Sequence, residues 1–162
     1  MKKLIAAGLF SLFSMPLLAV DAGQMAPDFK LSLLDGSKSV KLSDYRGQVV
    51  YLDFWASWCG PCRQSLPAMN GLQSDLFRKG FTVLAVNLDE EAAAAKNFLQ
   101  QFPVNYPVLA DAAGKTPESF GLQGMPTSYL IDKTGKVALV HQGYKDGDLR
   151  EIRQAVQQLL KN

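Results

Sequence analysis

The chain has few of the side chains that bind metals or cross-link a secreted domain. It contains two cysteines, Cys59 and Cys62, and one histidine, His141, in 162 residues. A structural zinc site needs four nitrogen, sulfur or oxygen ligands, usually cysteines and histidines, so these three residues are too few to close one. The sequence also lacks internal repeats and low-complexity linkers. Its length therefore suits a single domain with a single core.

The chain also lacks an excess of charge of one sign. Seventeen basic residues face fifteen acidic residues, for a formal net charge of +2. Without Lys2 and Lys3, which precede an apolar run, the two signs nearly cancel. Nucleic acids and acidic membrane surfaces attract strongly basic proteins, so we expect neither as a partner.

The N-terminus has the layout of a secretory signal peptide. Lys2 and Lys3 precede an apolar run from Leu4 to Val20, and small residues follow that run. The small-residue spacing favours cleavage after Ala22, with cleavage after Ala19 as the alternative. We therefore expect export to the periplasm of a bacterium.

This interpretation divides the chain into two parts. Residues 1–22 are the expected signal peptide, and residues 23–162 are the expected exported domain. The apolar run is also at the lower limit for spanning a bilayer. An uncleaved anchor in the inner membrane is therefore the alternative.

The two cysteines lie three positions apart, within "DFWASWCGPCRQSLP" (residues 53–67). A structural disulfide between them would close a very short loop and contribute only about 2 kcal/mol, against roughly 3 kcal/mol for a fifteen-residue loop. A domain of this size does not need so weak a cross-link. The pair is therefore interpreted as redox-active.

The flanking residues indicate how such a pair works. The run from Val49 to Trp55 has the composition and length of a buried strand. After the pair, apolar residues recur at helical spacing, which predicts that Cys59 lies at a helix N-terminus. Unpaired N–H groups there lower the pKa of a thiol and favour the thiolate. Cys62, one turn further on, is then placed to resolve a mixed disulfide. Pro61 suits the first turn of the helix, because its missing N–H costs the helix no hydrogen bond there.

The segment "DFWASWCGPC", with Pro67 downstream, resembles the active-site segment of thioredoxins. The rest of the chain from Gly23 is similar to exported thioredoxin-like proteins of the TlpA/ResA type. The similar segments are "APDF", a turn at Asp35 and Gly36, "LSDYRG", and "GLQGMPTSYLIDKTGKVALVHQG". The resemblance implies an α/β thioredoxin-like fold with a mixed central sheet and helices on both faces. An N-terminal two-strand extension and a short strand-helix insertion before the cis-proline loop complete the expected fold.

Pattern analysis supports this architecture independently. A strand, a helix and a strand at close spacing predict a parallel crossover. The expected elements after the cysteines are strands at 81–88, 106–111, 127–132 and 136–143, and helices at 90–102, at 114–122 and from Asp146 to the C-terminus.

The resemblance implies a second part of the site. In thioredoxin-like proteins the proline that matches Pro126 is cis and lies against the active-site disulfide. Pro126 would then turn the backbone of Met125 toward an extended substrate segment, which pairs as an added strand. Thr127, which is neither cysteine-like nor charged, fits a site that accepts a range of substrates. Trp58 is expected to form an exposed rim that substrate touches.

Asp53 is an unusual residue for a buried strand. A carboxylate there must be protonated or hydrogen-bonded, so its pKa should be raised. The matching acid of thioredoxin implies a proton acceptor for Cys62, through a water molecule. The alternative is a partly solvated residue at a strand edge. We interpret His141 as a structural residue.

The expected function is thiol-disulfide exchange at Cys59 and Cys62, without a dissolved cofactor or a metal. The dipeptide Gly60-Pro61 resembles that of reducing thioredoxins, which favours a protein-disulfide reductase. The resemblance implies a membrane electron-transfer protein as the donor, and apocytochrome c or another disulfide-containing periplasmic protein as the acceptor. We expect a monomer.

Three alternatives remain open at this stage. The same thiols would serve a disulfide oxidase or isomerase. A thiol peroxidase would share the "APDF" segment, although its cysteine follows a different pattern. A copper carrier, which belongs to a different class of protein, would use Cys59, Cys62 and His141.

Overall fold

The computed structural model of the chain describes residues 19–161, so residues 1–18 of the expected signal peptide lie outside it. The helices are α1 (Cys62–Leu76), α2 (Ala92–Gln101), α3 (Lys115–Phe120) and α4 (Asp148–Lys161), with short 3-10 helices η1 (Leu42–Tyr45) and η2 (Phe77–Lys79). The strands are β1 (Lys30–Leu33), β2 (Ser39–Lys41), β3 (Val49–Trp55), β4 (Phe81–Asn87), β5 (Val108–Ala110), β6 (Thr127–Ile131) and β7 (Val137–Gln142). These elements confirm the predicted order of strands and helices.

The strands form one mixed sheet in the order β2-β1-β5-β4-β3-β6-β7. Strands β3, β4 and β5 run parallel, which confirms the predicted crossover, and β6 runs antiparallel to β3. Every residue of β3 and β4 is buried. Because both faces of these strands are covered, their sequences are mostly apolar rather than alternating between apolar and polar residues.

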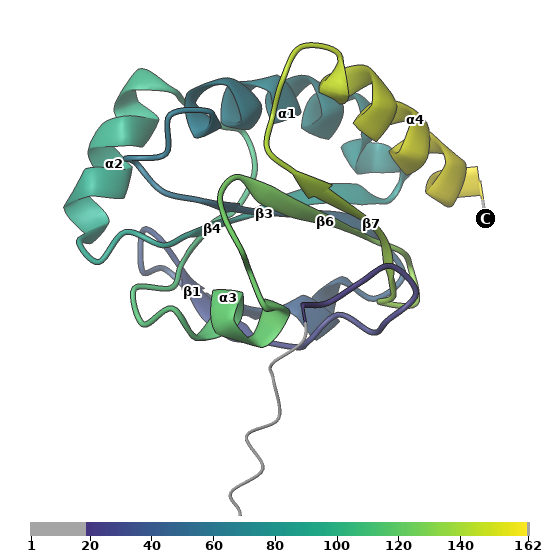
Figure 1. Cartoon of the computed structure of the whole chain (residues 1–162), viewed down its shortest axis with the longest axis horizontal. Coiled ribbons are helices and arrows are strands. Elements are labelled where there is room, and N and C mark those ends of the chain that lie inside the picture. Colours follow the sequence, from purple (N-terminus) through teal and green to yellow (C-terminus); the bar gives the residue numbers. More distant parts are fainter. Residues whose placement is uncertain (1–18, 162) are drawn as a thin grey trace, which may run out of the picture.

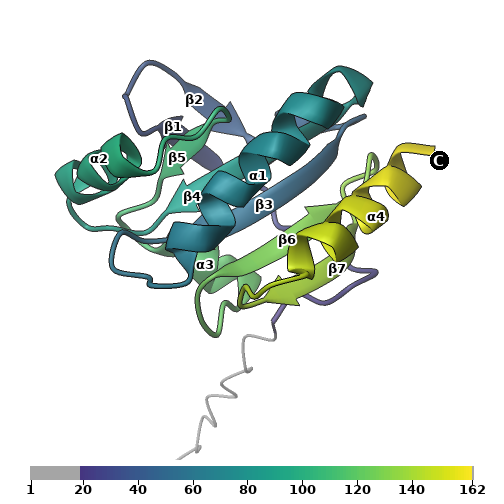
Figure 2. The same ribbon diagram turned by 90° about the horizontal axis from the view of Figure 1, so that it is seen from above.

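Helices cover both faces of the sheet, as expected (Figure 1). Buried residues of α1, α2 and α4 pack on one face together with Tyr51 and Trp55 of β3. Figure 2 shows α1 lying over β3 and β4, and α4 lying over β6 and β7, on that side. The opposite face packs against α3 and η1, where Phe54, Phe120 and Tyr129 meet in edge-to-face contacts. The fold is therefore a three-layer α/β arrangement, with an apolar core on each side of β3.

The N-terminal two-strand extension is part of the main sheet. Strands β1 and β2 pair as an antiparallel hairpin around the predicted turn at Asp35 and Gly36. Strand β1 also pairs antiparallel with β5, which in turn pairs with β4. The inserted strand thus joins the extension to the central strands, a long-range pairing that no local pattern predicts.

The segment from Val20 to Ala26 packs on the folded body. Val20 is buried, and its N–H donates to the carbonyl oxygen of Phe120 over 3.1 Å. Further along, the N–H of Gly23 donates to Val137 and that of Ala26 to Gly135. Contacts with the domain therefore begin three residues before Gly23. Within residues 19–161, no helix is both long enough and apolar enough to cross a membrane.

Candidate active site

Cys59 lies in the loop that leaves the carboxyl end of β3, and Cys62 is the first residue of the helix that follows this loop. They form a disulfide with an S–S distance of 2.03 Å and a Cα–Cα distance of 5.4 Å. Helix α1 begins at Cys62, and Cys59 lies three residues before it, so the helix starts later than predicted. Pro61, which has no N–H to donate, takes the N-cap position rather than a place in the first turn. The N–H of Cys59 donates instead to Ala56 in a tight turn.

The two cysteines differ slightly in their exposure to solvent. Cys62 is fully buried, whereas Cys59 keeps 4% of its surface exposed. Trp58, directly before Cys59, is 70% exposed, and Trp55 is completely buried. The loop therefore offers an exposed indole beside the more accessible of the two cysteines, in agreement with the predicted rim.

A buried carboxylate holds this loop in place. Both the N–H and the hydroxyl of Ser57 donate to Asp89, over 2.9 and 2.8 Å. The side-chain amide of Asn87 donates to the same carboxylate over 2.7 Å. Sequence reasoning missed these residues. The signal was present, because polar residues that follow adjacent parallel strands meet at one edge of the sheet.

The cis-proline loop lies beside the cysteine loop. The Met125–Pro126 peptide bond is cis, as the resemblance implied. In the sheet register, Thr127 pairs with Phe54, so the residues before Thr127 run alongside the residues after Trp55. Met125 packs against the apolar cluster that contains both cysteines. A hollow of about 200 Å³ lies beside this loop, lined by Gln123–Thr127, Gln142 and Gly143.

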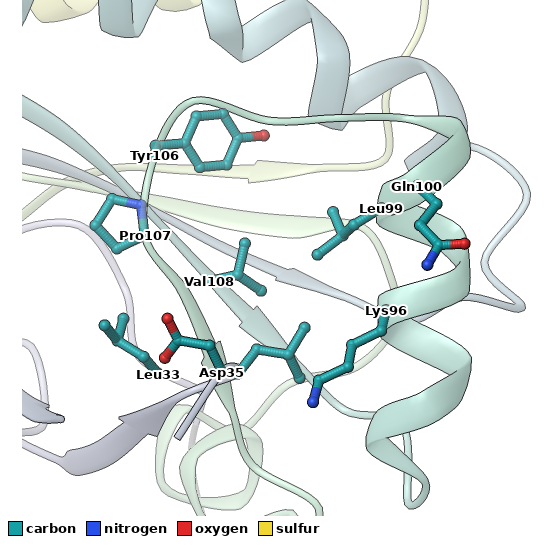
Figure 3. A pocket seen from close by; sticks show the side chains of 9 residues that line it. Leu33, Asp35, Lys96, Leu99, Gln100, Tyr106, Pro107 and Val108 are labelled. Carbon is teal, nitrogen blue, oxygen red and sulfur yellow. The ribbon is translucent and has the colours of Figure 1, made fainter. Parts of the chain in front are cut away.

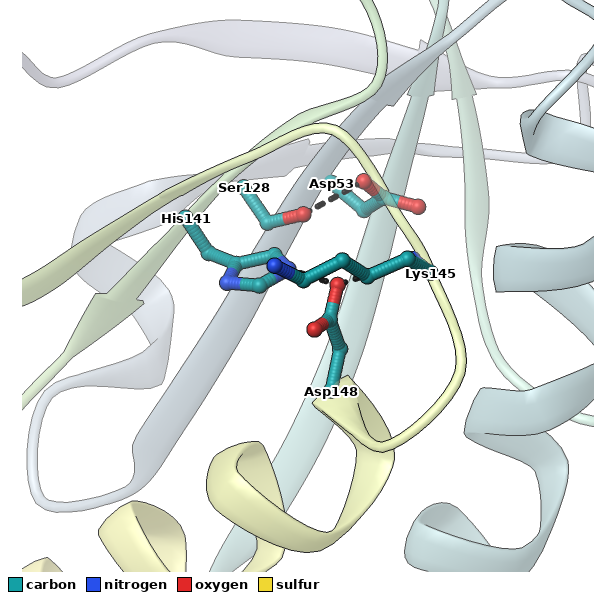
Figure 4. Close-up of polar contacts among 5 residues, drawn as sticks. All are labelled: Asp53, Ser128, His141, Lys145 and Asp148. Carbon is teal, nitrogen blue, oxygen red and sulfur yellow. Dashed lines mark hydrogen bonds and ion pairs between the residues drawn. The ribbon is translucent and has the colours of Figure 1, made fainter.

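Asp53 lies in the middle of β3, 1% exposed, on the strand face shared with Tyr51 and Trp55. The hydroxyl of Ser128 donates to its Oδ1 over 2.7 Å, and its Oδ2 has no partner among the described residues (Figure 4). Burial raises the pKa of Asp53 to about 7, although the hydrogen bond from Ser128 opposes that rise. The predicted rise in pKa is confirmed, and the interpretation of Asp53 as a solvated edge residue is wrong. Ser128 was not predicted.

His141 lies next to Ser128 in the register of β6 and β7. Its Nε2 lies 3.1 Å from Oδ2 of Asp148, and the N–H of Lys145 donates to the same oxygen (Figure 4). Asp148 thereby ties β7 to the start of α4. Within residues 19–161, no three histidine, cysteine, aspartate or glutamate residues are grouped so that they could hold a metal ion.

A larger hollow, of about 530 Å³, lies elsewhere on the domain (Figure 3). Its walls come from the β1–β2 hairpin, α2 and the start of β5, and include Leu33, Lys96, Leu99 and Val108. None of the predicted site residues lines it. The predicted site residues are therefore gathered at the carboxyl edge of β3 and not in this larger hollow.

Comparisons with known proteins cover most of the chain. Residues 21–159 match the Redoxin family. Thiol-disulfide oxidoreductase ResA from Bacillus thuringiensis subsp. konkukian is 40% identical over 118 residues, which are 73% of this chain and 68% of the relative. A protein assigned as the thiol:disulfide interchange protein DsbE, from Chlorobium tepidum, has a crystal structure that superposes with a TM-score of 0.83. The two sequences are 51% identical, and the superposition covers 88% of this chain and 99% of the other chain.

The raised pKa of Asp53 predicts how stability depends on pH. Because the folded protein binds this proton more tightly than the unfolded chain, the stabilisation is complete below about pH 4 and is lost as pH rises through 7. We expect Asp53→Asn to abolish this loss. Relative to the variant, the wild-type protein should lose on the order of 4 kcal/mol between pH 4 and 8.

Urea unfolding of the oxidised proteins at several pH values measures this difference. Parallel pH dependences for the wild-type protein and Asp53→Asn would mean that the pKa of Asp53 is not raised.

Proposed function

The chain belongs to the Redoxin family, as a thioredoxin-like thiol-disulfide oxidoreductase of the TlpA/ResA type, and on this premise we propose that it is an exported reductase of protein disulfides. The observation that carries the proposal is the Cys59–Cys62 disulfide, in which Cys59 keeps slight exposure and Cys62 is fully buried. The cis-proline loop beside this pair supports binding of an extended polypeptide as the substrate.

The reaction is a balanced exchange of two electrons. The Cys59 thiolate attacks a substrate disulfide, forms a mixed disulfide and releases one substrate sulfur as a thiolate. Cys62 then loses its proton to Asp53 and attacks the Cys59 sulfur. The Cys59–Cys62 bond forms, and the second substrate sulfur leaves with the electron pair and is protonated from solvent.

The direction of exchange rests on the residues between the cysteines. Gly60 and Pro61 resemble the dipeptide of reducing thioredoxins, which supports reduction of the substrate. A reductase must be reduced again after each cycle. A membrane electron-transfer protein that presents a dithiol is the proposed donor, and apocytochrome c or another exported disulfide protein is the proposed acceptor.

Export is the second part of the proposal. The signal-peptide pattern of residues 1–22 supports transport to the periplasm. Val20 is buried against the domain and hydrogen-bonded to Phe120, so removal of residues 1–22 would cost these contacts. This supports cleavage after Ala19, the earlier of the two positions that the sequence allows.

The two cysteines should fail in different ways when substituted. We expect Cys59→Ala to abolish reduction of a protein disulfide, because the accessible nucleophile is lost. Cys62→Ala should accumulate a mixed disulfide with the substrate, because nothing resolves it. Non-reducing gel electrophoresis and mass spectrometry distinguish the two outcomes. If Cys62→Ala turned over at the native rate without added thiol, its resolving role would be wrong.

The reduction potential of the pair tests the direction. We expect a value near the thioredoxin potential of about −270 mV, measured by equilibration with glutathione or dithiothreitol. A value near −120 mV, as in strongly oxidising relatives of the fold, would instead identify a disulfide donor.

The processing of the N-terminus tests export. When the full chain is expressed in a Gram-negative bacterium, we expect it in the periplasmic fraction, with a mass that corresponds to a chain beginning at Val20. A chain beginning at Gly23 would contradict the proposed position but not export. An intact chain in the membrane fraction would contradict cleavage and favour the anchor.

A further inference from the structure

The carboxylate of Asp53 has two strand neighbours, and only one of them is polar. In the sheet register, Asp53 pairs with Ala85 of β4 and with Ser128 of β6. Ala85 offers a methyl group, whereas the Ser128 hydroxyl lies 2.7 Å from Oδ1. Among the described residues, Ser128 is therefore the single hydrogen-bond donor to this buried acid.

This one bond makes the two carboxylate oxygens different. Oδ1 is occupied by Ser128, and Oδ2 is buried without a partner among residues 19–161. Asp53 also lies on the strand face that packs against the cluster containing Cys59 and Cys62. A carboxylate held at one oxygen presents the other oxygen as its site of protonation.

We propose that Ser128 is a positioning residue, which holds Oδ1 of Asp53 so that Oδ2 exchanges the proton of Cys62. This inference rests on the proposed function, because it specifies the acid-base step of the same site. It assigns a role to a serine that touches no reacting sulfur in the mechanism.

Oδ2 of Asp53 gains a proton in one half of the reaction cycle and loses it in the other. When Cys62 attacks the mixed disulfide, its proton moves to Oδ2, and Ser128 continues to donate to Oδ1. When a dithiol donor later reduces the Cys59–Cys62 bond, Cys62 leaves as a thiolate and takes the proton back from Oδ2. No electrons pass through Asp53 or Ser128, and each cycle leaves both unchanged.

Other titratable and charged groups lie around Asp53 and Ser128. They are Tyr51, Tyr106, His141, Tyr144, Lys145 and Asp148, besides the two cysteines. Burial, with the charge of Asp53, raises the pKa of Tyr51 and of Tyr106 well above the ordinary value, so both phenols stay protonated near neutral pH. The Tyr106 hydroxyl donates to Leu66, and Asp148 accepts from Lys145 and lies 3.1 Å from His141.

The first test measures Asp53 directly in the oxidised protein. Carbon NMR of the carboxyl group gives its pKa in the wild-type protein and in Ser128→Ala. Because a hydrogen bond favours the charged form, its loss should raise the pKa by about one pH unit. Ser128→Thr keeps a hydroxyl and should stay near the wild-type value.

A matched control uses a second buried serine. Ser65 in α1 is buried, and its hydroxyl has no hydrogen-bond partner among the described residues. Ser65→Ala therefore removes a hydroxyl of the same size without removing a hydrogen bond, and it should leave the pKa of Asp53 unchanged. An unchanged pKa in Ser128→Ala would overturn the inference, as would an equal rise in Ser65→Ala.

The second test follows the resolution step. With a pKa near 7, about half of the Asp53 carboxyl groups are ionised at pH 7. If the pKa rises by one pH unit in Ser128→Ala, only about a tenth of them are ionised at that pH. Ser128→Ala should therefore resolve a preformed mixed disulfide about fivefold more slowly than the wild-type protein. The pH profile should shift upward by the same amount. In the Asp53→Asn background, Ser128→Ala should have no further effect, and an equal slowing there would overturn the inference.

These tests separate the inference from the proposed function. The NMR measurement needs no substrate, so it remains decisive even if the cysteines prove inactive with protein disulfides. Conversely, an unmoved pKa in Ser128→Ala would leave exchange at Cys59 and Cys62 standing.

Discussion

Burial of β3 between two apolar layers is the constraint on which the rest of the structure depends. Strands β4 and β6 pair with it on either side, so its backbone polar groups are satisfied away from water. Its alternating side chains then supply the centre of both cores. A single carboxylate in this strand cannot reach solvent, and that confinement raises its pKa into the neutral range.

The same strand brings the two functional loops together. Because β4 is parallel to β3, both strands end at one edge of the sheet, where Asp89 accepts the hydrogen bonds of Ser57. Because β6 is antiparallel to β3, it begins at that edge and carries the cis-proline just before its first residue. The segment that holds the disulfide and the segment that holds the cis-proline, more than sixty residues apart in sequence, thus meet at one edge of the sheet.

Much of this arrangement is predictable from local patterns. The extent of β3, the cysteine pair, the exposed Trp58 and the order of later elements follow from apolar periodicity and motif spacing. The resemblance to thioredoxins added the cis form of Pro126. Local patterns could not predict that β1 joins β5, or that Ser128 bonds to Asp53, because both contacts depend on the register of strands that are distant in sequence. Helix α1 begins at Cys62, later than the sequence predicted, because Pro61 takes the N-cap position instead of a place in the first turn.

Both sulfurs are members of the apolar cluster that packs β3 against α1, α2 and α4. Folding and redox chemistry therefore form one thermodynamic cycle, in which packing that stabilises the disulfide form over the dithiol form lowers the potential of the pair. About 1.4 kcal/mol of such preference corresponds to 30 mV. Substitutions deep in this core, far from any substrate, can thus change whether the protein gives or takes electrons.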